Sequence, residues 1–296
     1  MTVTTVAEAL QSAAQSLDSH SDSPRLDAEL LLGKILGLSR SGLIARGNEQ
    51  LAIDREQAYA GLIARRLTGA PVAYLTGTRE FWSLPLTVTP AVLVPRPETE
   101  LLVELALQHL HENQLRPPGA QGRVSEARAR YILDLGTGSG AIALAIASEK
   151  PESRVMGVDI SPAALDVAMQ NSRDLGLSNV DWRLGSWFEA VPGRIFDMIV
   201  ANPPYIAAAD PALEKLAAEP AIALSVGPTG LEALSAIARD AGSHLYDGGW
   251  LIMEHGCDQA QDVAQLFESH GFTDVRSHID FSGRPRVTLG TIHSHH

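Results

Sequence analysis

Apolar residues in the first 80 positions recur at helical spacing and are separated by short breaks. One run covers residues 3–17, and a second follows Asp22-Ser23-Pro24, where the proline suits the first turn of a helix. The second run predicts a buried helix face made of Leu26, Leu30, Leu31, Ile35 and Leu36. A third run covers Asp54–Leu67 and stops at a Gly/Pro break. Together these runs predict a helical domain over residues 1–80.

After residue 80 the helical spacing of apolar residues stops, and residues that favour β-strands follow. Residues 81–88 predict one strand, Thr89-Pro90 a turn, and residues 92–94 a second strand, so we expect a β-hairpin over residues 81–96 that links two domains. Helical spacing returns in Pro97–Leu110. The segment 112–130 is rich in Pro, Gly, Gln and Arg and is expected to be an exposed loop on the rim opposite the site described below.

Strand and helix patterns alternate from Tyr131 onward. Strands are expected at residues 131–135, 154–158, 180–183, 196–201, 250–254, 274–278 and 286–289. Helices are expected at residues 140–149, 162–175, 231–244 and 258–270. This alternation predicts an α/β domain over residues 97–296, with a Rossmann-like, mostly parallel sheet. A short turn joins the last two strands, so the last strand is expected to be antiparallel.

Composition narrows the class of protein. With 296 residues, 45% of them hydrophobic and 20% charged, the chain can bury a sizeable core, and a disordered or coiled-coil protein is excluded. The net charge of −12 disfavours tight binding to a nucleic-acid backbone. The single cysteine, Cys257, excludes an internal disulfide and is expected to be buried. We expect a cytoplasmic protein with no metal site and no membrane contact, because no leader or membrane-spanning pattern is present.

The first strand of the alternating region ends in a glycine-rich loop, Gly136-Thr137-Gly138-Ser139-Gly140. Glycines permit the tight turn and let backbone amides approach a ligand closely. A turn without a ligand and a dinucleotide site are the alternatives. Asp134 argues against the dinucleotide, because a carboxylate two residues before Gly136 would repel a pyrophosphate. It is suited, directly or through water, to a cationic ligand.

A second acidic residue, Asp159, ends the next strand. There it is placed to accept hydrogen bonds from both hydroxyls of a ribose. Capping the helix that starts at Ser161-Pro162 is its alternative role. The glycine loop and Asp159 together resemble the S-adenosylmethionine site of a class I methyltransferase.

A further strand delivers Asn202-Pro203-Pro204-Tyr205 to the same edge of the sheet. Two prolines stiffen the backbone and remove two amide donors, which leaves carbonyl acceptors and an aromatic face. The Asn202 oxygen and the Pro203 carbonyl can each accept one N–H of a planar NH₂ group, and Tyr205 can pack against its π system. This arrangement favours methylation of an amide or amino nitrogen without a general base. A rigid loop without chemistry is the alternative.

These motifs resemble the peptide chain release factor glutamine methyltransferases, the HemK/PrmC family. The resemblance covers residues 70–290 and rests on the Asp134–Gly140 loop, Asp159 and the Asn202–Tyr205 tetrad. Further blocks that resemble the family are Glu80–Trp82, Leu93–Glu100, Ser186–Phe188, Glu219-Pro220, Glu254–Gly256 and Arg286–Gly290. Asn-Pro-Pro-Tyr alone also occurs in DNA amino-methylating enzymes, whereas the Pro-Arg-Pro-Glu-Thr-Glu block is more specific to the family.

The resemblance implies methyl transfer from S-adenosylmethionine to the glutamine N5 in the Gly-Gly-Gln loop of class I release factors, which modulates translation termination. It implies a monomer whose helical domain binds the release factor. Cofactor contacts would come from Gly136, Thr137, Gly138, Ser139, Gly140, Asp159, Trp187 and Asn202. Trp187 would lie near the adenine, with an ordinary core aromatic as the alternative. The glutamine would be held, and its methylation promoted, by Asn202, Pro203, Pro204 and Tyr205.

Other residues carry weaker signals. Glu254-His255 ends a strand at the same edge and is expected to be structural, because amide methylation needs no acid/base pair. Arg96 and Glu98–Glu100 would either border the cofactor, hinge the domains or be purely structural. The histidines at 293, 295 and 296 are expected to be a polar tail. Two competing functions remain: an adenine N6-methyltransferase acting on a flipped base, and a binding module without catalysis.

Overall fold

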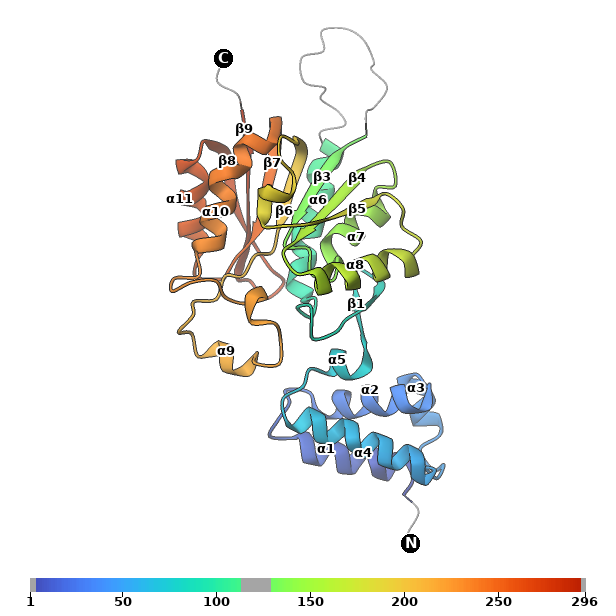
Figure 1. Cartoon of the computed structure of the whole chain (residues 1–296). Helices are drawn as coiled ribbons and strands as arrows, with labels where there is room; N and C mark the ends of the chain where they lie inside the picture. Colours follow the sequence, from blue (N-terminus) through green and yellow to red (C-terminus); the bar gives the residue numbers. More distant parts are fainter. Residues whose placement is uncertain (1–3, 113–128, 294–296) are drawn as a thin grey trace. The chain divides into compact units, whose positions relative to one another are not determined.

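The computed structural model describes residues 4–112 and 129–293, which form two compact units over residues 1–78 and 79–296. Most of the predicted loop 112–130 and the terminal residues His295 and His296 lie outside the described residues. Figure 1 shows helices alone in the first unit and a sheet flanked by helices in the second. No helix within the described residues is long and apolar enough to cross a membrane.

The first unit confirms the three predicted helices as α1 (Val6–Leu17), α2 (Pro24–Leu36) and α4 (Ile53–Leu67). A capping box between Thr5 and Glu8 begins α1, and Gly37, in the left-handed conformation, ends α2. The short helices α3 (Arg40–Ala45) and α5 (Val72–Thr76) were not predicted, because one or two turns hold too few positions to show a period.

The predicted buried face of α2 is partly wrong. Leu31 is fully buried, but Leu26 and Leu30 are 36% and 40% exposed. The face that packs inward carries Asp27, whose carboxylate is buried and paired with Arg66 at 2.8 Å. The apolar residues of α2 lie on more than one side of the helix, so their spacing alone did not show which side is buried. The buried side also holds Asp27, through its ion pair with Arg66.

The hairpin is real, but its predicted strands are wrong. It pairs β1 (Thr78–Phe81) with β2 (Leu84–Thr87) through a turn at Trp82 and Ser83, whose φ angles are 52° and 59°. Two positive φ angles are typical of a tight type I′ turn. The sequence does not predict this turn, because neither of its two central residues is a glycine. Residues 92–94 form no strand, and the Val94 amide donates instead to the Glu219 side chain at 3.0 Å.

The sheet of the second unit confirms the predicted α/β fold. Its strand order is β5-β4-β3-β6-β7-β9-β8, with β3 to β7 parallel and β9 antiparallel to both neighbours. The strands are β3 (Tyr131–Leu135), β4 (Arg154–Asp159), β5 (Val180–Leu184), β6 (Phe196–Ala201), β7 (Leu245–Glu254), β8 (Phe272–Ile279) and β9 (Pro285–Ile292). The antiparallel last strand is therefore confirmed.

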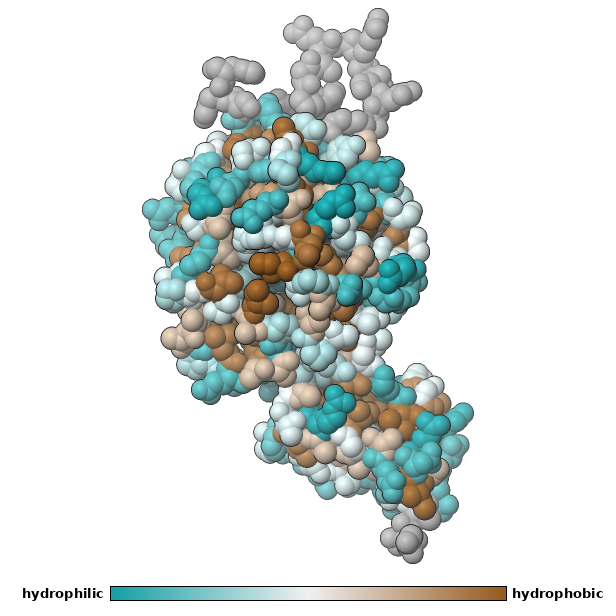
Figure 2. Space-filling view, viewed as in Figure 1, coloured by the Kyte–Doolittle hydropathy of each residue, from teal (hydrophilic) through white to brown (hydrophobic). Residues whose placement is uncertain are grey.

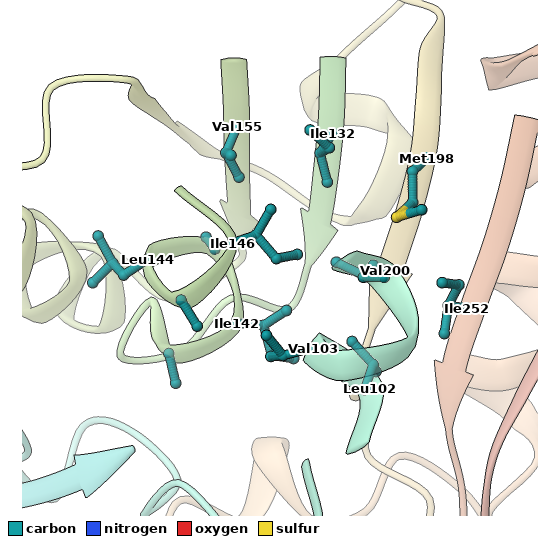
Figure 3. Close-up of a cluster of buried hydrophobic side chains, with 14 of the residues drawn as sticks. Leu102, Val103, Ile132, Ile142, Leu144, Ile146, Val155, Met198, Val200 and Ile252 are labelled. Atoms are coloured by element: carbon teal, nitrogen blue, oxygen red, sulfur yellow. The ribbon is translucent and has the colours of Figure 1, made fainter. Parts of the chain in front are cut away.

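Helices cover both faces of this sheet (Figure 1). The α-helices are α6 (Glu100–Glu112), α7 (Ala141–Glu149), α8 (Pro162–Asp174), α9 (Ala212–Lys215), α10 (Glu232–Ala241) and α11 (Ala260–Ser269). Single 3₁₀ turns are η1 (Pro97–Thr99), η3 (Trp187–Ala190), η4 (Ala221–Ala223) and η5 (Gly242–His244). Figure 3 shows Leu102 and Val103 of α6 beside Ile142 and Ile146 of α7, over the strands of one face. On the other face, α10 and α11 pack through Leu234, Ile237 and Phe267.

The pairing register aligns the ends of the central parallel strands. Leu135 pairs with Val158 on one side and with Ala201 on the other, and Ala201 pairs with Met253. The next residue of each strand or its loop therefore lies in one row along the edge of the sheet, namely Gly136, Asp159, Asn202 and Glu254. In an open α/β sheet this edge, where the connections diverge to opposite faces, is where ligands bind.

Trp182 of β5 packs closely against two glycines next to this row. A Cβ atom at Gly157 would lie 2.5 Å from the Trp182 ring, and one at Gly140 would lie 2.8 Å from it. The indole therefore occupies the space of two missing side chains and fixes β4 and the start of α7 against β5.

Substitution of Gly157 by alanine is expected to destabilise the second unit. The Gly157→Ala methyl group would overlap the ring, so the free energy of unfolding should fall by about 1–3 kcal/mol. Urea denaturation followed by tryptophan fluorescence would measure the loss. Gly61→Ala, in α4 where nothing lies within 4 Å of the added Cβ, is the control and should not destabilise. Equal stability of the two variants would contradict this account of Trp182.

Candidate active site

A pocket of about 290 Å³ lies at the row of strand ends within the second unit. Predicted site residues that line it are Gly136, Gly138, Asp159, Trp187, Asn202 and Pro204. Those that stand outside its lining are Thr137, Ser139, Gly140, Pro203 and Tyr205. Six of the predicted site residues therefore form part of the pocket wall, and the other five lie in the same two loops without lining the pocket.

Exposed apolar side chains form part of this pocket wall. Ile160, Ile222 and Val226 line it, yet they are 53%, 53% and 42% exposed. Figure 2 also shows apolar side chains gathered near the middle of the visible face of the second unit, within a mostly polar surface. Exposed apolar groups beside a concave site are typical of ligand or partner binding.

The glycine loop owes its shape to bonds within the protein. Gly136, Gly138 and Gly140 have φ angles of 73°, 56° and 82°, which favour glycine. The amides of Gly136 and Thr137 both donate to the Val158 carbonyl at 2.9 Å. The Gly138 amide donates to Asp159 Oδ2 at 2.8 Å. These amides are thus already satisfied, and what Gly138 offers a ligand is space, since nothing lies within 4 Å of the missing Cβ.

Asp134 lies inside this loop and not at the pocket wall. Its side chain is fully buried, and Oδ2 accepts hydrogen bonds from the Thr137 hydroxyl at 2.6 Å and the Ala143 amide at 3.2 Å. Burial raises the pKa of Asp134 to about 7, against the lowering effect of these two donors. The carboxyl group thus braces the turn between β3 and α7 and does not line the pocket, which disfavours a direct contact with a cationic ligand, while the predicted action through water stays a prediction.

Asp159 ends β4 and borders the pocket directly. Besides the Gly138 amide, its carboxylate accepts the Ser161 amide on Oδ1 at 2.9 Å. The N-cap of α8 is Ser161, whose hydroxyl accepts the Ala164 amide at 3.2 Å, so the alternative role of Asp159 as the helix cap is wrong. Each carboxylate oxygen can accept a second hydrogen bond, which keeps Asp159 able to bind hydroxyl groups.

Trp187 lies at the pocket wall beside Gly136 of the glycine loop. Its ring would be 3.5 Å from a Cβ atom at Gly136, and its φ angle of 44° is unusual for a residue other than glycine. Such strain persists where surrounding structure enforces it, often at binding sites. The ring also packs against the buried cluster that contains Phe188, so Trp187 contacts both the core and the pocket.

The Asn-Pro-Pro-Tyr tetrad begins at the end of β6. The Asn202 side-chain amide donates to Thr99 Oγ1 at 3.1 Å, which turns its carbonyl oxygen away from Thr99. The Tyr205 hydroxyl donates to Glu254 Oε1 at 3.1 Å. Burial and the nearby Glu254 raise the pKa of Tyr205, so its hydroxyl stays protonated and remains a donor.

The sequence singled out the blocks that contain Arg96, Thr99, Glu219 and Glu254, but it did not predict the contacts that these residues make. Thr99 and Glu254 are buried, and Glu254 has its pKa raised chiefly by that burial. Arg96 forms an ion pair with the buried Glu219 at 2.5 Å. The Pro-Arg-Pro-Glu-Thr-Glu block was the available signal, but a one-dimensional pattern does not show which of its side chains point inward.

Two further observations concern side chains outside the pocket. Cys257 is exposed, so the prediction that it is buried is wrong, because it lies in the loop after β7 and not in the strand itself. Among residues 4–112 and 129–293, no group of three or more His, Cys, Asp or Glu side chains could hold a metal ion.

The fold and this site define a methyltransferase. A family model described as "Methyltransferase domain" matches residues 128–278. A methyltransferase structure from Pyrococcus furiosus shares the fold, with a TM-score of 0.52 and 16% identity over 79% of this chain and 100% of that one.

Longer matches identify the family. A model described as "PrmC N-terminal domain" matches residues 8–77. A release factor glutamine methyltransferase from Aliivibrio fischeri is 45% identical over 91% of each chain. Another from Xylella fastidiosa is 46% identical over 90% of this chain and 92% of its own. The chain therefore belongs to the release factor glutamine methyltransferase family, as its motifs indicated.

The buried Asp134 is expected to make stability depend on pH. Its folded-state pKa of about 7 exceeds the ordinary 3.8. Between these two pH values, the native chain therefore holds a proton that the unfolded chain has released. The stability from this group is full below about pH 4 and is lost as the pH rises to about 7. Relative to Asp134→Asn, the free energy of unfolding of the natural chain should fall over this range by up to roughly 4 kcal/mol.

Urea denaturation at pH 4.5, 6 and 8 would measure this difference. Asp166→Asn, at an exposed position of α8, is the matched control and should follow the natural chain. If the free energies of unfolding of Asp134→Asn and of the natural chain changed in parallel with pH, the proton would not reside on Asp134.

Proposed function

We propose that this chain methylates the side-chain amide nitrogen (N5) of the glutamine in the Gly-Gly-Gln loop of class I release factors, with S-adenosylmethionine as methyl donor. The observation that carries the proposal is the Asn202 amide, held at the wall of the pocket that Gly138 and Asp159 also line. Family membership and the names of the relatives support the same reaction. Methylation of this loop would modulate translation termination.

The pocket fits S-adenosylmethionine. Asp159 has acceptor capacity left for ribose hydroxyls, Gly138 leaves room beside the loop, and Trp187 offers a flat apolar face to the adenine. The remaining predicted contacts, Thr137, Ser139 and Gly140, would act by shaping the loop. When bound, this cofactor supplies an electrophilic methyl group on a positively charged sulfur, and S-adenosylhomocysteine remains after transfer.

The tetrad would hold the acceptor amide. The Asn202 Oδ1 atom and the Pro203 carbonyl would each accept one N–H of the glutamine side chain. An amide nitrogen is a weak nucleophile because its lone pair is delocalised, so two fixed acceptors would stabilise the positive charge that develops on it. The tetrad prolines keep these acceptors in place, and Tyr205 would border the amide plane. The proton that nitrogen loses would pass to water.

The remaining parts of the proposal concern partner and setting. The helical unit would bind the release factor, and the enzyme would act as a monomer in the cytoplasm, where translation occurs. Methylation of adenine uses a similar tetrad, but residues 86–296 carry 15 basic and 26 acidic residues, which disfavours a nucleic-acid substrate.

A tritiated-methyl transfer assay would test the substrate. We expect label on a purified class I release factor and none on its Gln→Ala loop variant or on duplex DNA. Label on DNA alone would establish the adenine N6-methyltransferase instead. Binding of S-adenosylmethionine without transfer to the release factor would support a binding module.

Removal of the Asn202 side chain is expected to slow transfer more than it weakens cofactor binding. Asn202→Ala removes one preorganised acceptor, so kcat should fall about 10²-fold or more. Calorimetric affinity for S-adenosylmethionine should change much less. A kcat equal to that of the natural chain would eliminate the proposed amide clamp.

Substitution of Asp159 is expected to act on the cofactor. Asp159→Ala would remove a charged acceptor for the ribose, so affinity for S-adenosylmethionine should fall by about 1.5–3 kcal/mol. Isothermal titration calorimetry would measure this loss. S-Adenosylhomocysteine, which has the same ribose, should lose affinity equally, and an undiminished affinity for both would refute the ribose assignment.

A further inference from the structure

Buried polar groups lie behind the Asn202 amide. The amide donates to Thr99 Oγ1 at 3.1 Å, and Thr99 itself is 4% exposed. Tyr205, from the same tetrad, donates to Glu254 Oε1 at 3.1 Å. Thr99 and Glu254 are buried, whereas Asn202 and Tyr205 are partly exposed, so both tetrad side chains reach from the pocket side toward buried polar partners.

The hydrogen bond to Thr99 determines which way the Asn202 amide faces. The Thr99 hydroxyl oxygen accepts from the Asn202 side chain, and only the NH₂ end of an amide can donate. The carbonyl end then faces the opposite way, toward the pocket that Asn202 lines.

This orientation matters because the two ends of an asparagine amide are nearly equal in shape. Rotated by 180°, Asn202 would present NH₂ to the NH₂ group of a glutamine side chain, and two donors would oppose each other. The prolines fix the backbone of the tetrad but do not choose between the two side-chain orientations.

We propose that Thr99 is a positioning residue for methyl transfer: its hydroxyl oxygen accepts from the Asn202 NH₂ group and so holds the amide with its oxygen toward the acceptor nitrogen. This inference rests on the proposed function for its kinetic consequence. It gives a role to the threonine of the Pro-Arg-Pro-Glu-Thr-Glu block.

Two substitutions separate the hydroxyl from the shape of Thr99. Thr99→Val keeps the β-branched shape and removes the hydroxyl, so kcat should fall about 3- to 10-fold, the factor that one net hydrogen bond is worth. The KM for the release factor should change little, because it reflects contacts away from the reacting amide. Thr99→Ser keeps the hydroxyl and should restore most of kcat.

A double variant tests whether Thr99 acts through Asn202. Addition of Thr99→Val to Asn202→Ala should not lower kcat further, because the amide that Thr99 positions is already absent. Thr291→Val is the matched control for the loss of a buried hydroxyl. Thr291 is 4% exposed, as Thr99 is, and donates to the Gly249 carbonyl at 3.0 Å away from the pocket. This control should leave kcat unchanged.

A spectroscopic measurement tests the same inference without turnover. In ¹⁵N-labelled protein, the Asn202 side-chain NH₂ signals are identified by their loss in Asn202→Ala. They should exchange with water slowly in the natural chain and in Thr99→Ser, and at least 10-fold faster in Thr99→Val.

The results separate the two proposals. Failure of the natural chain to methylate a release factor would overturn the proposed function, while the exchange rates would still test the positioning of Asn202. Normal kcat together with unchanged exchange in Thr99→Val would overturn the role of Thr99. So would a Thr99→Ser variant as slow as Thr99→Val, because shape and not the hydroxyl would then matter.

Discussion

The parallel register across β4, β3, β6 and β7 is the constraint on which the site depends. Pairing of Leu135 with Val158 and Ala201, and of Ala201 with Met253, brings four strand ends to one line. A slip of one residue in any strand would reverse the faces of its side chains and move its functional residue out of that line. The buried cores on both sheet faces therefore specify the site as well as the fold, because they make each register unique.

Much of this arrangement was predictable because the relevant signals are periodic or local. The strands β3 and β6 were predicted with their bounds, since buried parallel strands form continuous apolar runs that end at glycine or Asn-Pro. The hairpin strands were misplaced because a Trp82-Ser83 turn carries no glycine. The inward face of α2 was misjudged because burial of Asp27 depends on Arg66, which lies far along the chain.

The candidate site shows the same division between local and long-range signals. Gly138, Asp159 and Asn202 belong to motifs within single turns and were recognised from spacing. Thr99 and Glu254 also lie in recognised blocks, but their contacts with the tetrad were not predicted, because these contacts arise only where distant segments meet. The glycine loop also differs in use from its expected role: its bonded amides make it a preformed surface, so a ligand would be selected there by shape more than by new hydrogen bonds to the backbone.

The exposed position of Cys257 has a practical consequence. It is the only thiol in the sequence, and it follows Glu254 by three residues, close to the row of strand ends. A maleimide dye would therefore attach at one defined place without any cysteine having to be removed first. Fluorescence from that dye can be recorded with and without S-adenosylmethionine, so the natural chain already carries a unique labelling position in the loop after β7.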